Sequence, residues 1–541
     1  MPERLASGVL LEESPQQTRA APRSRLLDRL QRPVSDRALI AAMVVLAAGL
    51  RLPNLTRTYW VDEGISVGIA SHHLTQIPAL LRLDGSPPLF YVLLHFWLQA
   101  FGSSEVSTHL LPLVTSLLLI PAAWWCARTL FGPTAARYAT VLAATNPFLA
   151  WFSTETRMYP LVCGLAMVGV TMAVRAARDR RGRDAVWAVL LLSALVYSHN
   201  WGLYIVAATA TVLVFVALRK GDRVVALGVL AGALAIGLLY LPWLPSFLFQ
   251  ARNTAAPWAI RPTIGDLIAD PASTLAGTLA AVLVPLVGLG VIWTWWSNPS
   301  ELDSPVDVLG SIGLLAVGAG WVVAQVDPSW TSRYLAVALG PLLLALVGLL
   351  APSRLGRRII ICSSAVLVVW SVIGSLLPAP NARYAKSNVA AVAGQARPFL
   401  RGGDLVVVTQ TEQVAVVAHY LQPGLVYATP TGVVTDPHVV DWRDLIHRLS
   451  VANACDSIAP AIDGLPVGAH VFVVNPLKRI GASGTTWSKT VNAQVVAINE
   501  LLFDAPALQE VGALSPASTP KPYSAVNGVL FVKRRGPTLC T

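Results

Sequence analysis

The sequence predicts a polytopic α-helical membrane protein, with about eleven transmembrane helices and a C-terminal extracytoplasmic α/β domain. Of its 541 residues, 54% are hydrophobic and only 13% are charged, whereas a water-soluble globule needs far more polar surface. Apolar runs long enough to cross a bilayer follow one another up to residue 377. Beyond Asn381 the runs become short and β-branched, which is typical of strands.

The net charge of +11 comes from arginine clusters that lie between the apolar runs. Arginine and lysine in such positions encode membrane orientation. We therefore expect membrane lipids among the partners of the chain, and no nucleic acid.

The N-terminal segment, residues 1–36, is polar, and no short apolar core with a small-residue cleavage site is present in it. It is predicted to be a cytoplasmic tail and not a removable signal. The first span is predicted over residues 37–52, and it leads the chain to the outer side.

An ambiguous apolar segment covers residues 87–97. It is short and begins with Pro87 and Pro88, and counting it as a span would put the later arginine clusters on the wrong side of the membrane. We interpret it as a helix at the outer interface, where Tyr91 and Trp97 suit the headgroup region.

Ten further spans are predicted from runs of about 20 apolar residues. They cover residues 106–127, 135–152, 158–175, 185–199, 201–218, 224–243, 273–296, 306–326, 334–351 and 358–377. This path places four basic clusters in the cytoplasm: Arg128 with Arg137; Arg175, Arg178, Arg180, Arg181 and Arg183; Arg219, Lys220 and Arg223; and Arg354, Arg357 and Arg358. Four clusters that agree on one orientation support this topology.

The predicted organisation has three parts: a cytoplasmic tail (1–36), a transmembrane domain (37–377) and an extracytoplasmic α/β domain (378–541). We expect a multi-pass protein of the plasma membrane, with its N-terminus in the cytoplasm and its C-terminal domain outside.

Two adjacent carboxylates, Asp62 and Glu63, follow the first span directly. Carboxylates at a membrane border are costly unless they are hydrated, paired or used. The predicted topology places both outside the cytoplasm, and they mark the first candidate for chemistry.

Further charged residues reach the same outer face at the ends of different spans: Glu155, Arg157, His199 and Arg333. Outer arginines are exceptions to the charge rule, and an anionic ligand such as a phosphate explains them. Each residue alone also has a structural explanation. Arg157 pairs with Glu155, Arg333 reaches lipid headgroups, and Glu63 caps a turn. Their convergence on one face favours a site built from several loops.

The C-terminal domain is predicted to have strands over 404–409, 470–475 and 527–532 and helices over 412–421 and 492–503. About 160 residues suffice for a core of their own. No second active site is apparent, because His419, His438, Asp441 and His447 are spread along the sequence and are expected at the surface. We interpret the domain as an acceptor-binding or structural cap.

Two cysteines, Cys455 and Cys540, are the only ones in the exported domain. Disulfides persist outside the cytoplasm, so we expect these two to be bonded. No Cys/His spacing indicates zinc and no Gly-rich loop indicates a nucleotide, so we expect no cofactor and assign no metal ligand.

The order of several motifs resembles the GT-C membrane glycosyltransferases. These are the outer Asp62-Glu63, the Pro-Pro-Leu-Phe-Tyr segment that ends in Phe101-Gly102-Ser103, Leu130-Phe131-Gly132, Glu155-x-Arg157-x-Tyr159, His199 and Arg333-Tyr334. Within that superfamily the chain is similar to the branch of protein O-mannosyltransferases, the lipid A aminoarabinose transferase and mycobacterial lipid-sugar-dependent mannosyltransferases. The resemblance covers residues 37–377, which would then be the catalytic domain.

The resemblance implies that a sugar is transferred, with inversion, from a polyprenyl-phosphate donor to an acceptor hydroxyl on the outer face. Asp62 would be the general base, supported by Glu63. Arg333 is the first candidate for the donor phosphate, followed by Arg157 and His199.

Three more residues are assigned to substrate binding. Glu155 orients Arg157 or contacts sugar hydroxyls, and Tyr159 and Tyr334 contribute aromatic surface. The loop has no Asp-x-Asp, unlike the metal-dependent oligosaccharyltransferase branch, so no divalent metal is indicated.

The sugar and acceptor rest on the resemblance alone. Mannose is the first choice, with a glycolipid, lipoglycan or glycan of the cell envelope as acceptor. Arabinofuranose or another pentose is the main rival. A transporter of lipid-linked sugars is the alternative from another class, although the spans form no obvious inverted halves. A non-catalytic scaffold leaves the outer charges unexplained.

Overall fold

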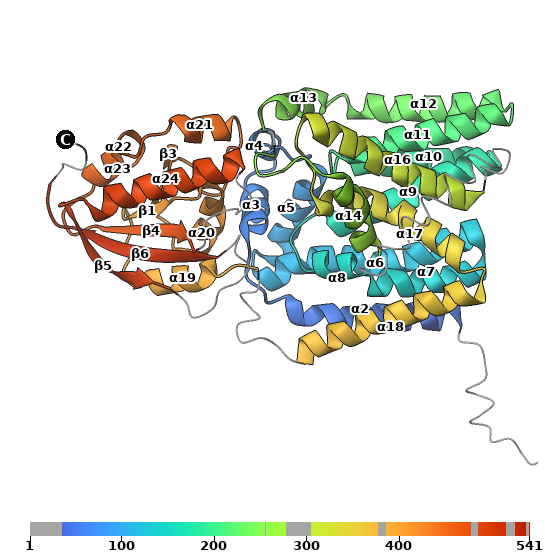
Figure 1. Ribbon diagram of the computed structural model, residues 1–541, viewed down its shortest axis with the longest axis horizontal. Coiled ribbons are helices and arrows are strands. Elements are labelled where there is room, and N and C mark those ends of the chain that lie inside the picture. The colour runs from blue at the N-terminus through green and yellow to red at the C-terminus, as the bar shows by residue number, and fades with distance from the viewer. Residues whose placement is uncertain are drawn as a thin grey trace, which may run out of the picture.

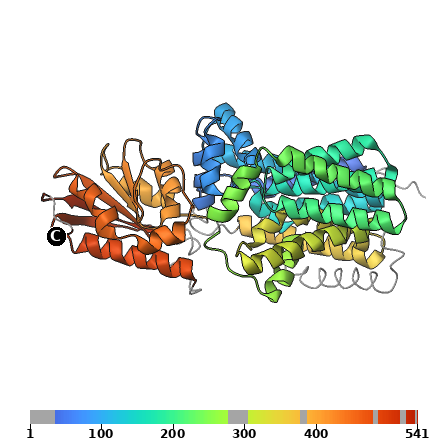
Figure 2. The same cartoon turned by 90° about the horizontal axis from the view of Figure 1, so that it is seen from above.

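The computed structural model describes residues 35–254, 256–276, 304–376, 386–477, 485–515, 525–536 and 540. It has two parts: a helical bundle and an α/β domain joined to one end of it (Figure 1). Figure 2 shows the same arrangement from above. The predicted tail, 1–36, and the predicted span 273–296 lie almost wholly outside the described residues. The fold class predicted from composition and apolar runs is confirmed.

Long helices, roughly side by side, make up the bundle. They are α2 (Asp36–Arg51), α6 (Glu105–Phe131), α7 (Pro133–Thr145), α9 (Tyr159–Asp179), α10 (Gly182–Val196), α11 (Gly202–Arg219), α12 (Arg223–Tyr240), α16 (Pro305–Val326), α17 (Ala336–Leu350) and α18 (Arg354–Leu376). Among the described helices, seven are long and apolar enough to cross a membrane. α2, α7 and α10 coincide with predicted spans but have only 16, 13 and 15 residues. The total of about eleven spans stays a prediction.

Local sequence signals set the ends of these helices. The hydroxyl of Ser35 accepts a hydrogen bond from Ala38 N at 3.2 Å at the start of α2, and Ser104 caps α6 in the same way. α6 and α7 are separated by Gly132 alone, whose φ of 90° few other residues adopt easily. Pro133 then occupies the first turn of α7, where a missing N–H costs nothing.

The basic clusters between the helices gather at the end of the bundle remote from the α/β domain (Figure 1). Asp36, at the start of α2, lies 2.7 Å from Arg137 and 3.6 Å from Arg128. Arg180, after α9, pairs with Asp222, which caps α12. The two sides predicted from the arginines therefore correspond to two ends of the bundle. The identity of the cytoplasmic end stays a prediction.

Shorter helices lie at the opposite end, next to the α/β domain: α3 (Val61–Ala70), α4 (Ile77–Asp84), α5 (Leu89–Phe101), α8 (Pro147–Phe152), α13 (Leu244–Asn253) and α14 (Ile264–Ala276). α4 ends at Gly85, which has a φ of 95°. α5 has 13 residues, and a helix of that length spans about 20 Å, less than the hydrocarbon core of about 30 Å. Its length is compatible with the interfacial interpretation, which remains a prediction.

The C-terminal domain is built on a six-stranded sheet of order β3-β2-β1-β4-β6-β5. β1 is parallel to both β2 and β4, and the other pairs are antiparallel. The strands are β1 (Leu405–Val408), β2 (Val426–Thr429), β3 (Gly432–Val434), β4 (His470–Pro476), β5 (Leu508–Leu514) and β6 (Val526–Lys533). The helices are α19 (Val389–Ala396), α20 (Val414–Tyr420), α21 (Leu445–Val451), α22 (Ala454–Ser457), α23 (Ala459–Asp463) and α24 (Thr486–Phe503).

Alternate residues of the buried central strand β1 pack on opposite faces of the sheet. Leu405 and Val407 belong to a core with Ile498 of α24, whereas Val406 and Val408 belong to the larger core that continues into the helical bundle. Strands buried on both faces are expected to be continuous apolar runs. This explains why β1, β4 and β6 were predicted correctly.

The polar strand β5 was missed, and so were β2 and β3. The sequence of β5, Leu-Gln-Glu-Val-Gly-Ala-Leu, is partly exposed and lacks the apolar signature. The predicted helices over 412–421 and 492–503 are confirmed as α20 and α24. Of the predicted surface histidines, His438 and His447 are exposed, whereas His419 is half-buried; His419 and His438 both lie at the junction of the domains. The ring of His419 is 4.8 Å from that of Tyr59, and the carbonyl of His438 packs against Gly68.

The junction itself depends on two glycines of α3. A Cβ added at Gly68 would lie 2.1 Å from the carbonyl oxygen of His438, and one at Gly64 would lie 2.7 Å from Cβ of Val416 in α20. Only a helix face without side chains lets the α/β domain approach this closely. The helix that begins with Asp62 is therefore packed directly against the C-terminal domain.

Cys455, in α22, and Cys540, near the C-terminus, form a disulfide across 85 residues of sequence. The loop that it closes contains β4, α24, β5 and β6. Closing a loop of this length removes conformational entropy from the unfolded chain.

We expect Cys455→Ser to lower the free energy of unfolding by roughly 2 to 5 kcal/mol, because the unfolded chain regains that entropy. Thermal unfolding in detergent measures the change, and Cys126→Ser, away from the disulfide, is the control. Mass spectrometry of an unreduced digest should find Cys455 and Cys540 in one linked peptide pair. Free, alkylatable thiols at both positions would contradict the bond.

Candidate active site

Asp62 lies in the first turn of α3, where the helix dipole favours a negative charge. Its Oδ2 atom is 3.4 Å from Nη1 of Arg333 and 4.0 Å from Nε of Arg157. Arg157 precedes α9, and Arg333 belongs to the short 3-10 helix Ser332–Leu335 before α17. Three segments that are far apart in the sequence thus bring one carboxylate between two guanidinium groups, as the convergence of outer charges predicted.

These groups line a cavity of about 330 Å³ at the end of the bundle. Its walls include Asp62, Arg157, His199, Arg333, Tyr334 and, from the C-terminal domain, Trp442. Trp442 packs on Trp258 with ring centroids 4.6 Å apart, and its backbone N–H donates to the carbonyl of Leu83 at 3.1 Å. The cavity is therefore formed by both domains.

The charged groups of the cavity lack hydrogen bonds at their central atoms. Within the described part of the chain, Asp62 Oδ2, Arg157 Nε and Arg333 Nε are buried and have no hydrogen-bond partner. The ion-pair distances of 3.4 and 4.0 Å are too long to replace such bonds. Buried polar atoms are nearly always bonded in proteins, so these three atoms are available to a ligand.

Other contacts hold the two guanidinium groups in place. Arg157 Nη1 donates to the hydroxyls of Ser66 at 2.9 Å and Tyr91 at 3.3 Å. Arg333 lies over the rings of Trp60 and Tyr334, 5.5 and 5.9 Å from their centroids, where cation–π attraction stabilises it. Both arginines are thus positioned before any ligand arrives.

His199 lines the cavity as a neutral imidazole. Burial, together with the positive charges of Arg157 and Arg333, lowers the pKa of His199 to about 3. Its Nδ1 accepts a hydrogen bond from Trp201 N at 3.1 Å, so Nε2 carries the hydrogen. Its ring packs against Tyr334, with centroids 4.8 Å apart. His199 can therefore donate a hydrogen bond to a ligand, but it does not add a positive charge.

The balance of charge in the cavity favours an anion. Two other acidic side chains lie in its wall, Asp84 and Asp327, and burial raises the pKa of both, which favours their neutral acids. Burial disfavours the charge of Arg157, but interactions with Tyr91, Tyr159, Asp62 and Asp84 prevail and raise the pKa of Arg157. Two guanidinium groups therefore face one close carboxylate, Asp62, and a phosphate would supply the missing negative charge.

Glu63 has a different environment from its neighbour and does not line the cavity. Its fully buried carboxylate lies 2.7 Å from His109 Nε2 and 2.9 Å from Lys386 Nζ, and it accepts a hydrogen bond from Thr156 N at 2.8 Å. Burial opposes its charge, but Lys386 and His109 prevail and lower the pKa of Glu63. The oxygens of Glu63 are thus occupied by these partners, and its role as support or understudy of Asp62 stays a prediction.

Glu155 is buried, and its Oε2 has no hydrogen-bond partner among the described residues. Burial raises the pKa of Glu155 to about 7. Its side chain forms no ion pair with Arg157 within the described residues, and the two residues are linked through the backbone, where Arg157 N donates to Glu155 O at 2.6 Å. The expectation that Glu155 orients Arg157 through its side chain is therefore wrong. Contact with sugar hydroxyls stays a prediction.

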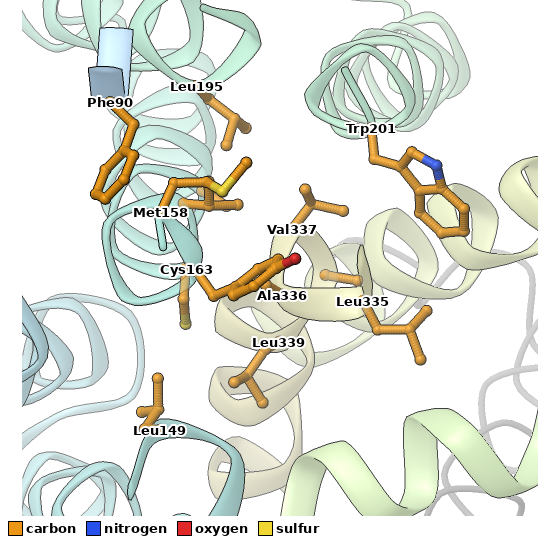
Figure 3. Close-up of a cluster of buried hydrophobic side chains, with 14 of the residues drawn as sticks. Phe90, Leu149, Met158, Cys163, Leu195, Trp201, Leu335, Ala336, Val337 and Leu339 are labelled. Atoms are coloured by element: carbon orange, nitrogen blue, oxygen red, sulfur yellow. The ribbon is translucent and has the colours of Figure 1, made fainter. Parts of the chain in front are cut away.

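Tyr159 begins α9, beneath the cavity, and its ring centroid is 6.3 Å from that of His199. Apolar side chains pack around this region. Figure 3 shows Met158, Leu195, Trp201, Leu335 and Val337 turned toward one another, from four different segments. Met158 and Trp201 also line the cavity, so the site rests on a packed apolar floor.

Several residues of the site were not predicted, among them Asp84, Gln250, Trp442, His109 and Lys386. Asp84 lies three residues before the apolar segment that was interpreted as an interfacial helix, and the neighbouring sequence did not indicate its place in the cavity wall. His109 lies in a predicted span, where a polar side chain is a signal of function that sequence reasoning can use. Lys386 gave no such signal.

Comparison with known proteins identifies a matching segment and similar folds. Residues 85–245 match the family of dolichyl-phosphate-mannose-protein mannosyltransferases. No curated protein sequence matches the chain. Among solved structures, ArnT from Cupriavidus metallidurans in the apo state is similar with a TM-score of 0.57 and 15% identity, over 91% of this chain and 98% of that one. The structure of the same protein bound to undecaprenyl phosphate gives 0.57 and 15%, over 92% and 98%.

Arabinofuranosyltransferase AftD from Mycobacteria has a TM-score of 0.49 and 14% identity, over 93% of this chain and 40% of that one. The family match is thus confined to residues 85–245, whereas the fold of ArnT is shared over 91% of this chain.

Proposed function

We propose that the protein is an inverting glycosyltransferase that uses a polyprenyl-phosphate sugar, with mannose as the first choice. The acceptor is a hydroxyl of a cell-envelope glycolipid, lipoglycan or glycan on the outer face of the membrane. One observation carries the proposal: the unpartnered Nε atoms of Arg157 and Arg333 flank the unpartnered Oδ2 of Asp62 in one buried cavity.

The two arginines suit the leaving group of such a reaction. When the glycosidic bond breaks, the lipid phosphate gains negative charge, and cations fixed beforehand stabilise that charge without reorganisation. Arg333 and Arg157 each have an Nε–H free for a phosphate oxygen among the described residues. His199 adds a neutral donor. The rings of Tyr334 and Tyr159 lie next to the ring of His199 and help to position it.

Asp62 suits the role of general base. An acceptor hydroxyl is a poor nucleophile, so a carboxylate takes its proton as the new bond forms. In the proposed step, the acceptor oxygen bonds to the anomeric carbon, the bond from that carbon to the phosphate oxygen breaks, and the proton moves to Asp62. Binding of the phosphate by the arginines relieves Asp62 of its two ion pairs and leaves a freer carboxylate.

The choice of donor has two further supports. The family that matches residues 85–245 is described by dolichyl-phosphate-mannose, and ArnT, whose fold the chain shares, binds undecaprenyl phosphate. Arabinofuranose or another pentose on the same lipid is the rival donor. A transporter of lipid-linked sugars is disfavoured, because the charged groups gather at one end of the bundle and not along a path through it.

We expect Asp62→Asn to reduce sugar transfer by roughly 100-fold or more, because the amide cannot accept the proton of the acceptor. Membranes that contain the protein are incubated with radiolabelled polyprenyl-phosphate mannose or arabinofuranose, and transfer and expression are both measured. Asp504→Asn, an exposed acid of the C-terminal domain, is the matched control. A well-expressed Asp62→Asn variant with most of its activity would rule out the base. Transport of labelled lipid without transfer by the native chain would favour the flippase.

We expect Arg333→Ala to weaken donor binding about tenfold or more, because a charge-assisted hydrogen bond to phosphate is lost. Arg333→Lys should give an intermediate effect, since lysine keeps the charge without the planar fork. The measurement is the KM for the donor at saturating acceptor. An unchanged donor KM in both variants would assign the phosphate to other residues.

A further inference from the structure

A run of five polar residues, Thr409-Gln410-Thr411-Glu412-Gln413, directly follows the apolar strand β1. All five are buried, with exposed fractions of 1%, 1%, 8%, 0% and 1%. Burying polar side chains costs free energy unless each finds a partner. Such a run at the end of a core strand therefore requires an explanation.

Four of the five side chains have at least one polar atom without a partner. Within the described residues, both amide atoms of Gln413, Oε1 of Gln410, Oγ1 of Thr411 and Oε2 of Glu412 have no hydrogen bond. The bonds that do exist orient the cluster. Gln410 Nε2 donates to Glu412 Oε1 at 2.7 Å, and Thr409 Oγ1 donates to Asn475 Oδ1 at 2.9 Å. The free atoms on four neighbouring residues form a set of donors and acceptors without a ligand.

The position of the run in the sheet is one at which α/β proteins bind ligands. It follows the carboxyl end of β1, whose parallel neighbours β2 and β4 lie on opposite sides of it. The chain therefore changes direction across the sheet here, and ligands of open α/β sheets bind at such switch points.

The run also lies at the junction with the helical bundle. It leads directly into α20, where Val416 packs against Gly64 of α3 (Figure 1). Thr411 lines a hollow together with Leu80 and Leu83 of α4. Asp62 lies two residues before Gly64 in α3, so it is on the helix against which α20 packs. Burial raises the pKa of Glu412 to about 7.

The chemistry of the run matches a carbohydrate. Amides, hydroxyls and a carboxyl that favours its neutral form both donate and accept hydrogen bonds, as sugar hydroxyls do. Residues 409–413 contain no lysine or arginine, so the run lacks the cations that a phosphate needs. The arginine-lined cavity therefore suits the phosphate of the lipid donor. The run suits a different part of the reacting pair, an uncharged sugar.

We propose that Thr409–Gln413 is the acceptor site: its free amide, hydroxyl and carboxyl atoms bind the hydroxyls of a carbohydrate acceptor and present one of them to Asp62. This inference rests on the proposed function for the role of Asp62. The binding of the carbohydrate itself does not depend on it, and binding and transfer are therefore tested separately.

The test uses the full chain in detergent with octyl mannoside, octyl arabinofuranoside and octyl glucoside as probes. Binding is measured by saturation-transfer NMR titration, and donor affinity is measured in parallel. Gln413→Leu and Gln410→Leu should weaken the binding of the preferred glycoside about tenfold or more. Donor affinity should stay as in the native chain. The melting temperature of Gln413→Leu should stay equal or rise, because both atoms of the removed amide are unpartnered. That of Gln410→Leu should fall, because Glu412 loses its hydrogen bond from Gln410.

Gln494→Leu is the matched control. Gln494 is also buried, but its amide nitrogen donates to the carbonyls of Leu449 and Ala452 at 2.8 and 2.9 Å. This variant should lower the melting temperature and leave glycoside binding unchanged.

Two results would overturn the proposed acceptor site: no glycoside binds the native chain, or Gln413→Leu binds as the native chain does. Glycoside binding that follows these expectations in a chain that consumes no polyprenyl-phosphate sugar would keep the carbohydrate site and refute the proposed function.

Discussion

The geometry of the cavity depends on the contacts of the buried carboxylate of Glu63. It joins His109 of α6, the backbone of Thr156 before α9, and Lys386 at the start of the described C-terminal domain. A buried charge with partners of this kind cannot move without leaving one of them unpaired, which is costly. Asp62 directly precedes Glu63 in the chain, so the anchoring of Glu63 fixes the place of Asp62 between Arg157 and Arg333.

The groups around Asp62 combine firm support with unpartnered atoms at the centre. Arg157 and Arg333 are held by hydroxyls and aromatic rings, while their Nε atoms, like the side chains that follow β1, lack partners among the described residues. Stability is lost where polar atoms are buried without bonds. That loss is expected at sites whose groups are preorganised for a ligand. The arginines are cationic, as a phosphate-bearing donor requires, and the side chains that follow β1 are uncharged or favour a neutral form, as a sugar acceptor requires.

The sequence predicted the features that depend on short-range patterns. Apolar runs located the bundle helices, β-branched runs located β1, β4 and β6, and the sidedness of arginines brought Asp62, Arg157, His199 and Arg333 to one face. Pairing over long distances was not predictable. Lys386 meets Glu63 across 323 residues, and no local pattern at either residue names the other. Glu155 and Arg157 show the converse, since two charges that are close in sequence form no side-chain pair within the described residues.

A double-mutant cycle on Glu63 and Lys386 tests most directly whether this contact holds the site together. Lys386→Met removes the lysine that balances the buried carboxylate of Glu63, so it should destabilise the chain by about 3 to 5 kcal/mol, whereas the double variant with Glu63→Gln should recover much of that loss. Thermal unfolding and sugar transfer are measured for all four chains. We predict a coupling of about 2 kcal/mol or more, with transfer impaired in each single variant. The claim would be contradicted if the two substitutions had additive effects on stability and if Lys386→Met transferred sugar as well as the native chain does.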